Sequence, residues 1–464
     1  MSGSSNHNLP HIALLPSAGM GHLSPFLRLA SLLSSHNLKV TIITPNPTVS
    51  LSESQTLLHF FTSFPQITQI PLHLLPSHNN QTTSSQDPFY NHMERIHHSS
   101  HLLLSLLPSL SPSLSALITD MSLTSSFLPI TQSLNLPNYI LFTSSAQMLT
   151  LFVKYHSIMD SIINSTHDDS LQIPFPRSWI PPPLLESTQN SLKTYIAENG
   201  KKMAASTGIL VNTFQSIELS SLNNLNGGGV ITTLPPVIAI GPLAPLIDEK
   251  QNQELTWLGS QPAGSVVYVS FGSRTAMSRE QLRELGEGLV RSGSKFMWVV
   301  KDKKVDTEDE ESLDKIIGGE LMEKMKENGM VLKNWVNQEE VLRHESIGCF
   351  MSHCGWNSVT EAMWNGVRVL AWPQHGDQKM NADIVDKIGL GIWPKNWGWG
   401  GEMVVNGSEI AESIKEIMGN ELLRVGALRI REEAKRAAEL GGSSDKELRG
   451  LIETWKQAHV DVVV

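Results

Sequence analysis

The sequence predicts an α/β protein built from two Rossmann-like, doubly wound domains. Short apolar runs that fit buried parallel strands recur along most of the 464 residues. Segments with helical apolar spacing separate them, and this alternation is typical of parallel sheets. The length suits two domains, and a polar, proline-containing stretch at residues 241–253 divides the chain.

The first half opens with an expected strand at residues 11–16, followed by a glycine-rich turn and a helix at residues 23–33. Residues 77–86 and 173–185 are rich in Ser, Pro or His, and we expect them to be long surface loops or lids. The remaining strands of this half are expected at residues 39–44, 115–120 and 138–143 and near Gly208 and Val237.

The second half repeats the alternation. A strand at residues 265–272 ends in a small loop, a helix follows Ser278, and the next strand covers residues 295–300. The charge-dense stretch at residues 301–315 fits a solvated loop or helix face better than a binding patch. Strands and helices then alternate further, and the pattern is helical from Gly407 to the end.

Composition excludes several classes of protein. A net charge of −10 with 17% charged residues argues against nucleic-acid binding, which needs a basic face. No apolar run reaches the roughly 20 residues of a membrane span, and the first residues lack a signal-peptide pattern. The two cysteines, Cys349 and Cys354, are too few for a disulfide framework. We therefore expect a soluble, cytoplasmic protein without membrane insertion.

A 44-residue block, residues 335–378, carries polar residues spaced like a nucleotide-sugar site. Trp335 follows a strand end, where an indole can stack on a flat base. His353 ends another strand, and residues 356–358 open a helix whose N–H groups and dipole favour an anion. Asn357 and Ser358 are also ordinary N-cap residues, so capping is the alternative interpretation. Asp377 and Gln378 stand at the next strand-to-helix junction and can bind sugar hydroxyls.

This block resembles the signature box of plant UDP-dependent glycosyltransferases, position by position. The resemblance implies the GT-B fold, with two domains that face a central cleft. It places an acceptor-binding domain at residues 1–241, a linker at 242–256 and a UDP-sugar-binding domain at 257–440. Residues 441–464 would form a final helix that crosses back to the first domain.

The resemblance also assigns roles to individual residues. Trp335 would stack on uracil while the main chain of Val336 reads the base edge, and Gln338 and Glu361 would bind ribose. Gln378 favours glucose, so the expected co-substrate is UDP-glucose. The chain contains no D-x-D sequence, and we expect no metal. The pyrophosphate residues would be His353, Trp356, Asn357, Ser358 and Ser273, and the sugar contacts Asp377, Gln378 and Thr143.

Two residues of the first half match the family's catalytic pair. His22 lies in a glycine-rich turn at a strand end, and the ordinary imidazole pKa of about 6.5 suits a general base. Asp120 ends a strand of the same sheet and would orient the imidazole, although a helix N-cap is its alternative role. A single displacement by a hydroxyl or carbon nucleophile inverts the anomeric centre.

Four segments resemble the flavonoid C-glycosyltransferase branch: residues 375–378, 87–89, 395–400 and the opening stretch 11–30. The expected reaction is therefore transfer of glucose to an aromatic carbon of a polyhydroxylated phenolic ketone. A 2-hydroxyflavanone or a dihydrochalcone such as phloretin would yield a β-C-glucoside. Asp87 and Phe89 are candidates for positioning this acceptor, and an Asp-Pro turn with an aromatic plug is the alternative.

Three other functions are alternatives to C-glucosyl transfer. A phenolic O-glucosyltransferase would use the same fold and donor. A catalytically silent nucleotide-sugar binding protein would not need both His22 and Asp120. An NAD-dependent oxidoreductase is disfavoured because residues 19–22 do not complete G-x-G-x-x-G. We expect a monomer whose partners are a UDP-sugar and a small phenolic acceptor.

Overall fold

The structure, a computed structural model, describes residues 9–76, 88–164, 173–231, 233–246, 253–272, 274–301, 311–333 and 336–463. The chain divides into two compact units, each treated by itself below. The first comprises Met1–Pro174, Pro182–Leu243 and Ala437–Val464, and the second Phe175–Pro181 and Ala244–Arg436.

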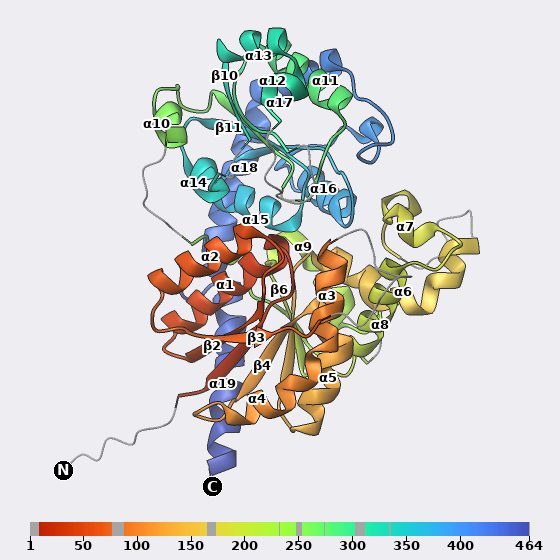
Figure 1. Ribbon diagram of the computed structural model, residues 1–464, viewed down its shortest axis with the longest axis vertical. Coiled ribbons are helices and arrows are strands. Elements are labelled where there is room, and N and C mark those ends of the chain that lie inside the picture. Colours follow the sequence, from red (N-terminus) through yellow and green to blue (C-terminus); the bar gives the residue numbers. More distant parts are fainter. Residues whose placement is uncertain are drawn as a thin grey trace, which may run out of the picture. The chain divides into compact units, whose positions relative to one another are not determined.

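In the first unit the described strands form a parallel sheet of order β3-β2-β1-β4-β5-β6-β7. Helices α1 and α2 lie on one side of this sheet and α3 and α5 on the other (Figure 1). The strands are β1 (His11–Leu15), β2 (Lys39–Asn46), β3 (Thr68–His73), β4 (Ala116–Asp120), β5 (Asn138–Phe142), β6 (Gly208–Val211) and β7 (Val237–Ala239). The helices are α1 (Met20–Ser35), α2 (Leu51–Ser63), α3 (Pro88–His98), α4 (Leu103–Ser109), α5 (Thr124–Ser133), α6 (Ala146–Asn164), α7 (Pro182–Leu185), α8 (Ser191–Met203), α9 (Gln215–Asn226) and α19 (Ser443–Val463).

The second unit has a parallel sheet of order β10-β9-β8-β11-β12-β13 in its described residues. Its strands are β8 (Val266–Ser270), β9 (Lys295–Val299), β10 (Gly329–Leu332), β11 (Ile347–Ser352), β12 (Arg368–Ala371) and β13 (Gly391–Ile392). Its helices are α10 (Gln253–Gly259), α11 (Arg279–Ser292), α12 (Leu313–Ile317), α13 (Gly319–Lys326), α14 (Gln338–Arg343), α15 (Trp356–Asn365), α16 (Gln378–Lys387), α17 (Gly407–Gly419) and α18 (Glu421–Ala438).

Strand order reverses at one point in each sheet, between β1 and β4 in the first and between β8 and β11 in the second. At such a switch point the chain leaves neighbouring strands in opposite directions, which opens a crevice at their carboxyl ends. The fold therefore marks one place in each unit where a ligand can approach the backbone closely.

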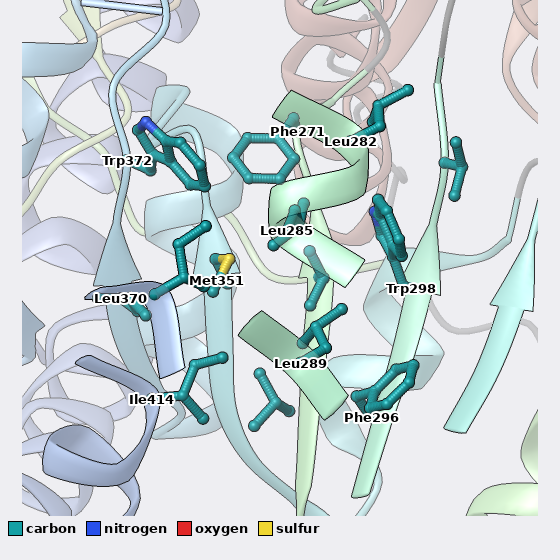
Figure 2. Close-up of a cluster of buried hydrophobic side chains, with 14 of the residues drawn as sticks. Phe271, Leu282, Leu285, Leu289, Phe296, Trp298, Met351, Leu370, Trp372 and Ile414 are labelled. Carbon is teal, nitrogen blue, oxygen red and sulfur yellow. The ribbon is translucent and has the colours of Figure 1, made fainter. Parts of the chain in front are cut away.

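Large apolar side chains fill the second unit on one face of its sheet (Figure 2). Leu282, Leu285 and Leu289 come from one stripe of α11 and are at most 2% exposed. Phe271 packs edge-on against Trp372 with ring centroids 5.5 Å apart. This core fixes the ends of β8 and β12, the strands that precede two of the predicted donor-binding segments.

The last helix, α19, belongs to the first unit. Its Trp455 is 1% exposed and packs edge-on against Tyr139 of β5, with ring centroids 5.6 Å apart. Ser444 donates a hydrogen bond to the carbonyl of Gly241. The helix is thus part of the core of this unit.

One of the two expected loops differs from expectation. Residues 173–185 are not a plain loop, because they contain a 3₁₀ turn at Arg177–Trp179 and the short α7. Trp179 lies 5.5 Å from Trp393, ring to ring, so Phe175–Pro181 groups with the second unit. The other expected loop, residues 77–86, lies outside the described residues. Within the described ranges, no helix combines the length and apolar composition that a membrane span requires.

Candidate functional site

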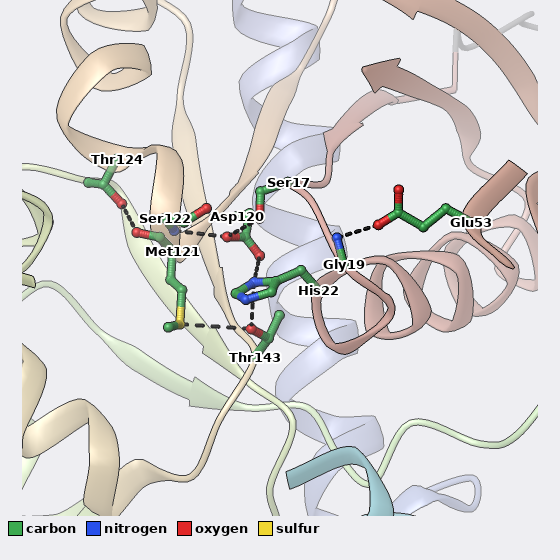
Figure 3. A network of polar contacts seen from close by, with 9 residues as sticks. All are labelled: Ser17, Gly19, His22, Glu53, Asp120, Met121, Ser122, Thr124 and Thr143. Carbon is green, nitrogen blue, oxygen red and sulfur yellow. Dashed lines mark hydrogen bonds and ion pairs between the residues drawn. The ribbon is translucent and has the colours of Figure 1, made fainter. Parts of the chain in front are cut away.

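The switch point of the first unit brings His22 and Asp120 together (Figure 3). His22 lies in the first turn of α1, directly after β1, and Asp120 is the last residue of β4. The Nδ1 atom of His22 is 2.8 Å from Oδ2 of Asp120. The imidazole is 25% exposed and the carboxylate is fully buried. One partner can therefore meet a ligand while the other is shielded from water.

Asp120 is held as an anion by its surroundings. Its Oδ1 accepts hydrogen bonds from the Ser17 hydroxyl at 2.9 Å and the Ser122 N–H at 2.8 Å. Burial alone would raise the pKa of Asp120, but the charge and hydrogen bond of His22 and the bonds from Ser122 lower it below its ordinary value. The Ser122 bond also makes Asp120 the N-cap of the 3₁₀ turn Met121–Leu123. Asp120 therefore both contacts His22 and caps this turn.

Thr143, expected to contact the sugar, lies beside the same imidazole nitrogen. Its Oγ1 is 3.2 Å from Nδ1 of His22, and its hydroxyl donates to the sulfur of Met121 at 3.8 Å. Two acceptors thus face Nδ1, which places the proton there and the lone pair on Nε2. An imidazole in this tautomer can accept a proton at Nε2.

The loop before α1 is tightly shaped. Gly19 is the N-cap of α1 and has φ +97°, a left-handed conformation that favours glycine. A Cβ at Gly19 would come within 3.3 Å of the Phe89 ring. Phe89 is 8% exposed and begins α3, so it packs beneath this loop as an aromatic plug. Its proposed partner Asp87 lies outside the described residues.

In the second unit, His353 follows β11 at the switch point and lies between two glycines. A Cβ at Gly272, after β8, would be 2.7 Å from Nε2 of His353, and one at Gly355 would be 2.5 Å away. Burial and the nearby charge of His375 lower the pKa of His353 to about 3. Its Nδ1 is buried and has no hydrogen-bond partner among the described residues. The ring is therefore a neutral hydrogen-bond donor.

Helix α15 begins without a side-chain cap. Its N-cap is Gly355, so Trp356, Asn357 and Ser358 occupy the first turn and do not cap the helix. The capping alternative for Asn357 and Ser358 is therefore wrong. The first N–H groups of the helix point out of its amino end, as anion-binding helices require.

Gln338 and Glu361, the expected ribose residues, contact each other. Nε2 of Gln338 donates to Oε2 of Glu361 at 2.7 Å and to the Ser358 hydroxyl at 2.9 Å. The amino ends of α14 and α15 are thereby linked. Val336 is 8% exposed and precedes α14. Trp335 and Ser273, expected at the base and the pyrophosphate, lie outside the described residues.

Asp377 and Gln378 begin α16, and both engage the surrounding loop. Oε1 of Gln378 accepts from the N–H groups of Gln374 at 2.8 Å and His375 at 2.9 Å. Its Nε2 is 3.4 Å from Nδ1 of His375. Oδ2 of Asp377 accepts from Asn381 at 2.9 Å. Gln378 therefore shapes the loop that precedes it, a role that its sequence position did not suggest.

Comparisons with known proteins show the family of the chain. The family model of UDP-glucoronosyl and UDP-glucosyl transferases matches residues 232–429. UDP-glycosyltransferase 708G2 of Citrus unshiu is 50% identical over 461 residues, 96% of this chain and 97% of the relative. The chain belongs to this transferase family. The UDP-glycosyltransferase CGT of Oryza sativa subsp. indica is 42% identical, with 96% of each chain covered.

Solved structures of UDP-glycosyltransferases share the fold. LpCGTa, crystallised with UDP, has a TM-score of 0.86 and 44% identity, over 96% of this chain and 99% of that one. UGT71G1 of Medicago truncatula, solved with UDP-glucose, has a TM-score of 0.82 at 26% identity, over 98% and 100%. The chain is thus a UDP-glycosyltransferase of the GT-B fold that transfers a glycosyl group from a UDP-sugar.

Sequence reasoning missed several residues of this glycosyltransferase. Ser17 gave no signal, because its bond to Asp120 spans 103 positions. Glu53, which binds the loop of His22, stands in an S-x-x-E pattern after Ser50 that predicts a helix start. Among the described residues, no group of three or more His, Cys, Asp or Glu side chains is arranged to hold a metal ion.

Proposed function

We propose that this enzyme transfers glucose from UDP-glucose to an aromatic carbon of a polyhydroxylated phenolic ketone, with inversion to a β-C-glucoside. The observation that carries the proposal is the 2.8 Å contact between Nδ1 of His22 and the buried Asp120. It leaves Nε2 as the proton acceptor at a partly exposed ring. The names of similar proteins, CGT of Oryza sativa and LpCGTa, support the branch to which the enzyme is assigned.

The chemistry uses one base. Nε2 of His22 takes a phenolic proton, and Asp120 stabilises the imidazolium that forms. The phenolate charge spreads to the ortho carbon, which attacks C1 of glucose as the C1–O bond to UDP breaks. The proton on that carbon then passes to water, which restores the aromatic ring as a phenolate, and the imidazolium of His22 returns its proton to the phenolate oxygen. Whether carbon or oxygen attacks is a matter of which atom is aimed at C1.

The second unit would hold the donor. The pyrophosphate would meet the neutral His353, the amino end of α15 with Asn357 and Ser358, and Ser273 of the facing loop. Glu361 and Gln338 would bind ribose, and Trp335 with Val336 would bind uracil. Asp377, Gln378 and Thr143 remain the proposed sugar contacts. The 50% identity to a named UDP-glycosyltransferase supports the donor class.

Incubation with UDP-glucose and phloretin tests the proposal. We expect a product with one added hexose that survives acid hydrolysis and shows cross-ring fragments in tandem mass spectrometry. Release of free glucose on hydrolysis would instead identify an O-glucosyltransferase. His22→Ala should leave only a small residual turnover to either product, and full turnover by this variant would overturn the assigned base.

We also propose that the enzyme acts without a metal, as a cytosolic monomer. The two thiols, Cys349 and Cys354, are buried and unpaired, and burial raises the pKa of Cys349 to about 12, which suits a reducing compartment. Turnover should be unchanged by EDTA, and its loss with restoration by Mg²⁺ or Mn²⁺ would contradict metal independence.

A further inference from the structure

A buried carboxylate from α2 holds the loop that carries His22. Glu53 is 4% exposed, and one of its oxygens accepts from the N–H of Gly19 (Figure 3). The other oxygen accepts from the N–H of Val49 at 3.0 Å. We propose that Glu53 is a positioning residue that sets where the ring of His22 lies. The inference rests on the proposed function, since it takes His22 as the base.

Gly19 connects the two side chains directly. Its N–H donates to Glu53, and its carbonyl accepts from the N–H of His22 at 3.0 Å and of Leu23 at 2.9 Å. Gly19 therefore fixes both the start of α1 and the turn on which His22 lies. A shift of the Glu53 carboxylate would move the peptide groups that carry the base.

The loop is also held from two other directions. The hydroxyl of Ser17 donates to Asp120 at 2.9 Å, and the ring of Phe89 packs against Gly19. These contacts fix the loop toward β4 and toward α3. Glu53 supplies the third anchor, toward α2, and binds the backbone at the residue whose left-handed φ sets the turn.

Burying the charged carboxylate of Glu53 costs free energy, which argues that Glu53 does more than cap its own helix. Burial raises the pKa of Glu53, although the N–H groups of Val49, Gly19 and Ser50 and the charge of His22 oppose the shift. An ordinary capping-box glutamate reaches only the nearby N–H groups of its own helix start. Glu53 also reaches Gly19, which lies 34 positions earlier in the chain.

A small cavity beside Glu53 makes the geometry sensitive to side-chain length. Apolar residues, Leu23 and Leu57 among them, line it together with Glu53, Ser17 and His92. A shorter side chain would withdraw into this space rather than be pressed back against Gly19. Glu53→Asp should therefore fail to restore the function that Glu53→Gln loses.

Glu53→Gln is the main test, because it keeps shape and volume while one oxygen becomes an NH₂ group. One of the two backbone N–H groups then loses its acceptor. We expect kcat to fall about 10- to 100-fold, the scale of a small misplacement of a reacting group, with KM for UDP-glucose unchanged. Ser50→Ala is the matched control: it removes the cap of the same helix, where Ser50 accepts from the Glu53 N–H at 3.3 Å. This control should lower the unfolding temperature and keep kcat.

A double-mutant cycle with His22→Ala separates positioning from general destabilisation. If Glu53 acts through His22, Glu53→Gln will not reduce the residual turnover of His22→Ala further. The proposal would be overturned if Glu53→Gln lowered turnover by the same factor in the wild-type and His22→Ala enzymes. It would also be overturned if Glu53→Gln kept the kcat of wild type.

Hydrogen exchange gives a readout that needs no activity. The amides of Gly19 to Leu23 should exchange faster in Glu53→Gln and at the wild-type rate in Ser50→Ala. Unchanged exchange in both variants would refute the anchoring of the loop. A wild-type enzyme that does not turn over UDP-glucose would refute the proposed function instead, while the exchange result would still decide whether Glu53 fixes the loop.

Discussion

Asp120 performs two tasks with one carboxylate. Oδ2 faces His22, and Oδ1 accepts from Ser17 and from the N–H that begins a 3₁₀ turn. All of these partners are donors, so an amide at this position cannot satisfy them all. The NH₂ group of an asparagine would face a donor on one side, or would force the imidazole proton to the other nitrogen.

Asp120→Asn should therefore lower kcat by about 10³- to 10⁴-fold, the effect of holding a catalytic histidine in the wrong tautomer. Binding of UDP, measured by calorimetry, should be unchanged because the residues proposed to bind its uracil, ribose and pyrophosphate belong to the second unit. Steady-state kinetics with the phenolic acceptor measure the loss. A variant that keeps a tenth or more of the turnover would show that the carboxylate is not needed to hold the imidazole.

Gln378 is the second residue whose role depends on its loop. Its Oε1 accepts two backbone N–H groups, so Gln378→Leu should expose both amides while Gln378→Glu keeps an acceptor for them. We expect faster hydrogen exchange at Gln374 and His375 in the leucine variant only. Turnover with UDP-glucose should fall in the leucine variant. Equal protection in both variants would show that the loop does not depend on this side chain.

At the scale of elements, β12 is tied to the end of α17 by Arg368. Its Nε donates to the carbonyl of Gly348 at 2.8 Å, and Nη1 donates to those of Ile417 at 2.8 Å and Met418 at 3.0 Å. Arg368 is 5% exposed, and its guanidinium meets the last carbonyls of the helix. The side chain therefore anchors the strand to the end of the helix.

Arg368→Met should lower the free energy of unfolding by about 2 to 4 kcal/mol, since several charged hydrogen bonds to buried backbone carbonyls are lost. Urea unfolding followed by tryptophan fluorescence measures the change. Arg424→Met is the control, because the Arg424 side chain is exposed and pairs with the exposed Glu421. Equal midpoints for the two variants would contradict the anchoring role.

Strands were predictable where every residue is buried, and the donor-binding block was predictable because its residues are close together in the sequence. The strands β1 and β8 are buried along their whole length and read as continuous apolar runs. Strand β3 was missed because it is an edge strand with Pro71 inside and Leu72 as its one buried residue. The donor block was recognisable because its residues are close in sequence. The contacts of Ser17 and Glu53 were not, because nothing local encodes a partner 103 or 34 positions away.

For the whole molecule, buried histidines set the response to acid. Burial lowers the pKa of His92 to about 4, and burial with the charge of His375 lowers that of His353 to about 3, while the unfolded chain titrates near 6.5. The unfolded state therefore binds more protons between these values, so stability falls as the pH drops below 6.5. Glu53 and Glu218, whose pKa values burial raises, oppose part of this loss.

Each of the two histidines should cost about 2 kcal/mol of stability near pH 5 relative to neutral pH. Urea unfolding at both pH values measures the loss, and His92→Leu should make it smaller. An unfolding free energy that is the same at both pH values would show that these side chains do not control acid sensitivity. The same conclusion would follow if the change in unfolding free energy between the two pH values were equal in His92→Leu and wild type.

The membership of α19 in the first unit has a consequence for how the protein is made. Trp455 completes a core whose other members, such as Tyr139, are translated more than 300 residues earlier. Domains of a growing chain ordinarily fold in order from the amino terminus. Here the contact of Trp455 with Tyr139 can form only after the entire second unit has left the ribosome. The second unit can be native before the first is finished, and the unfinished first unit is where chaperones would be needed.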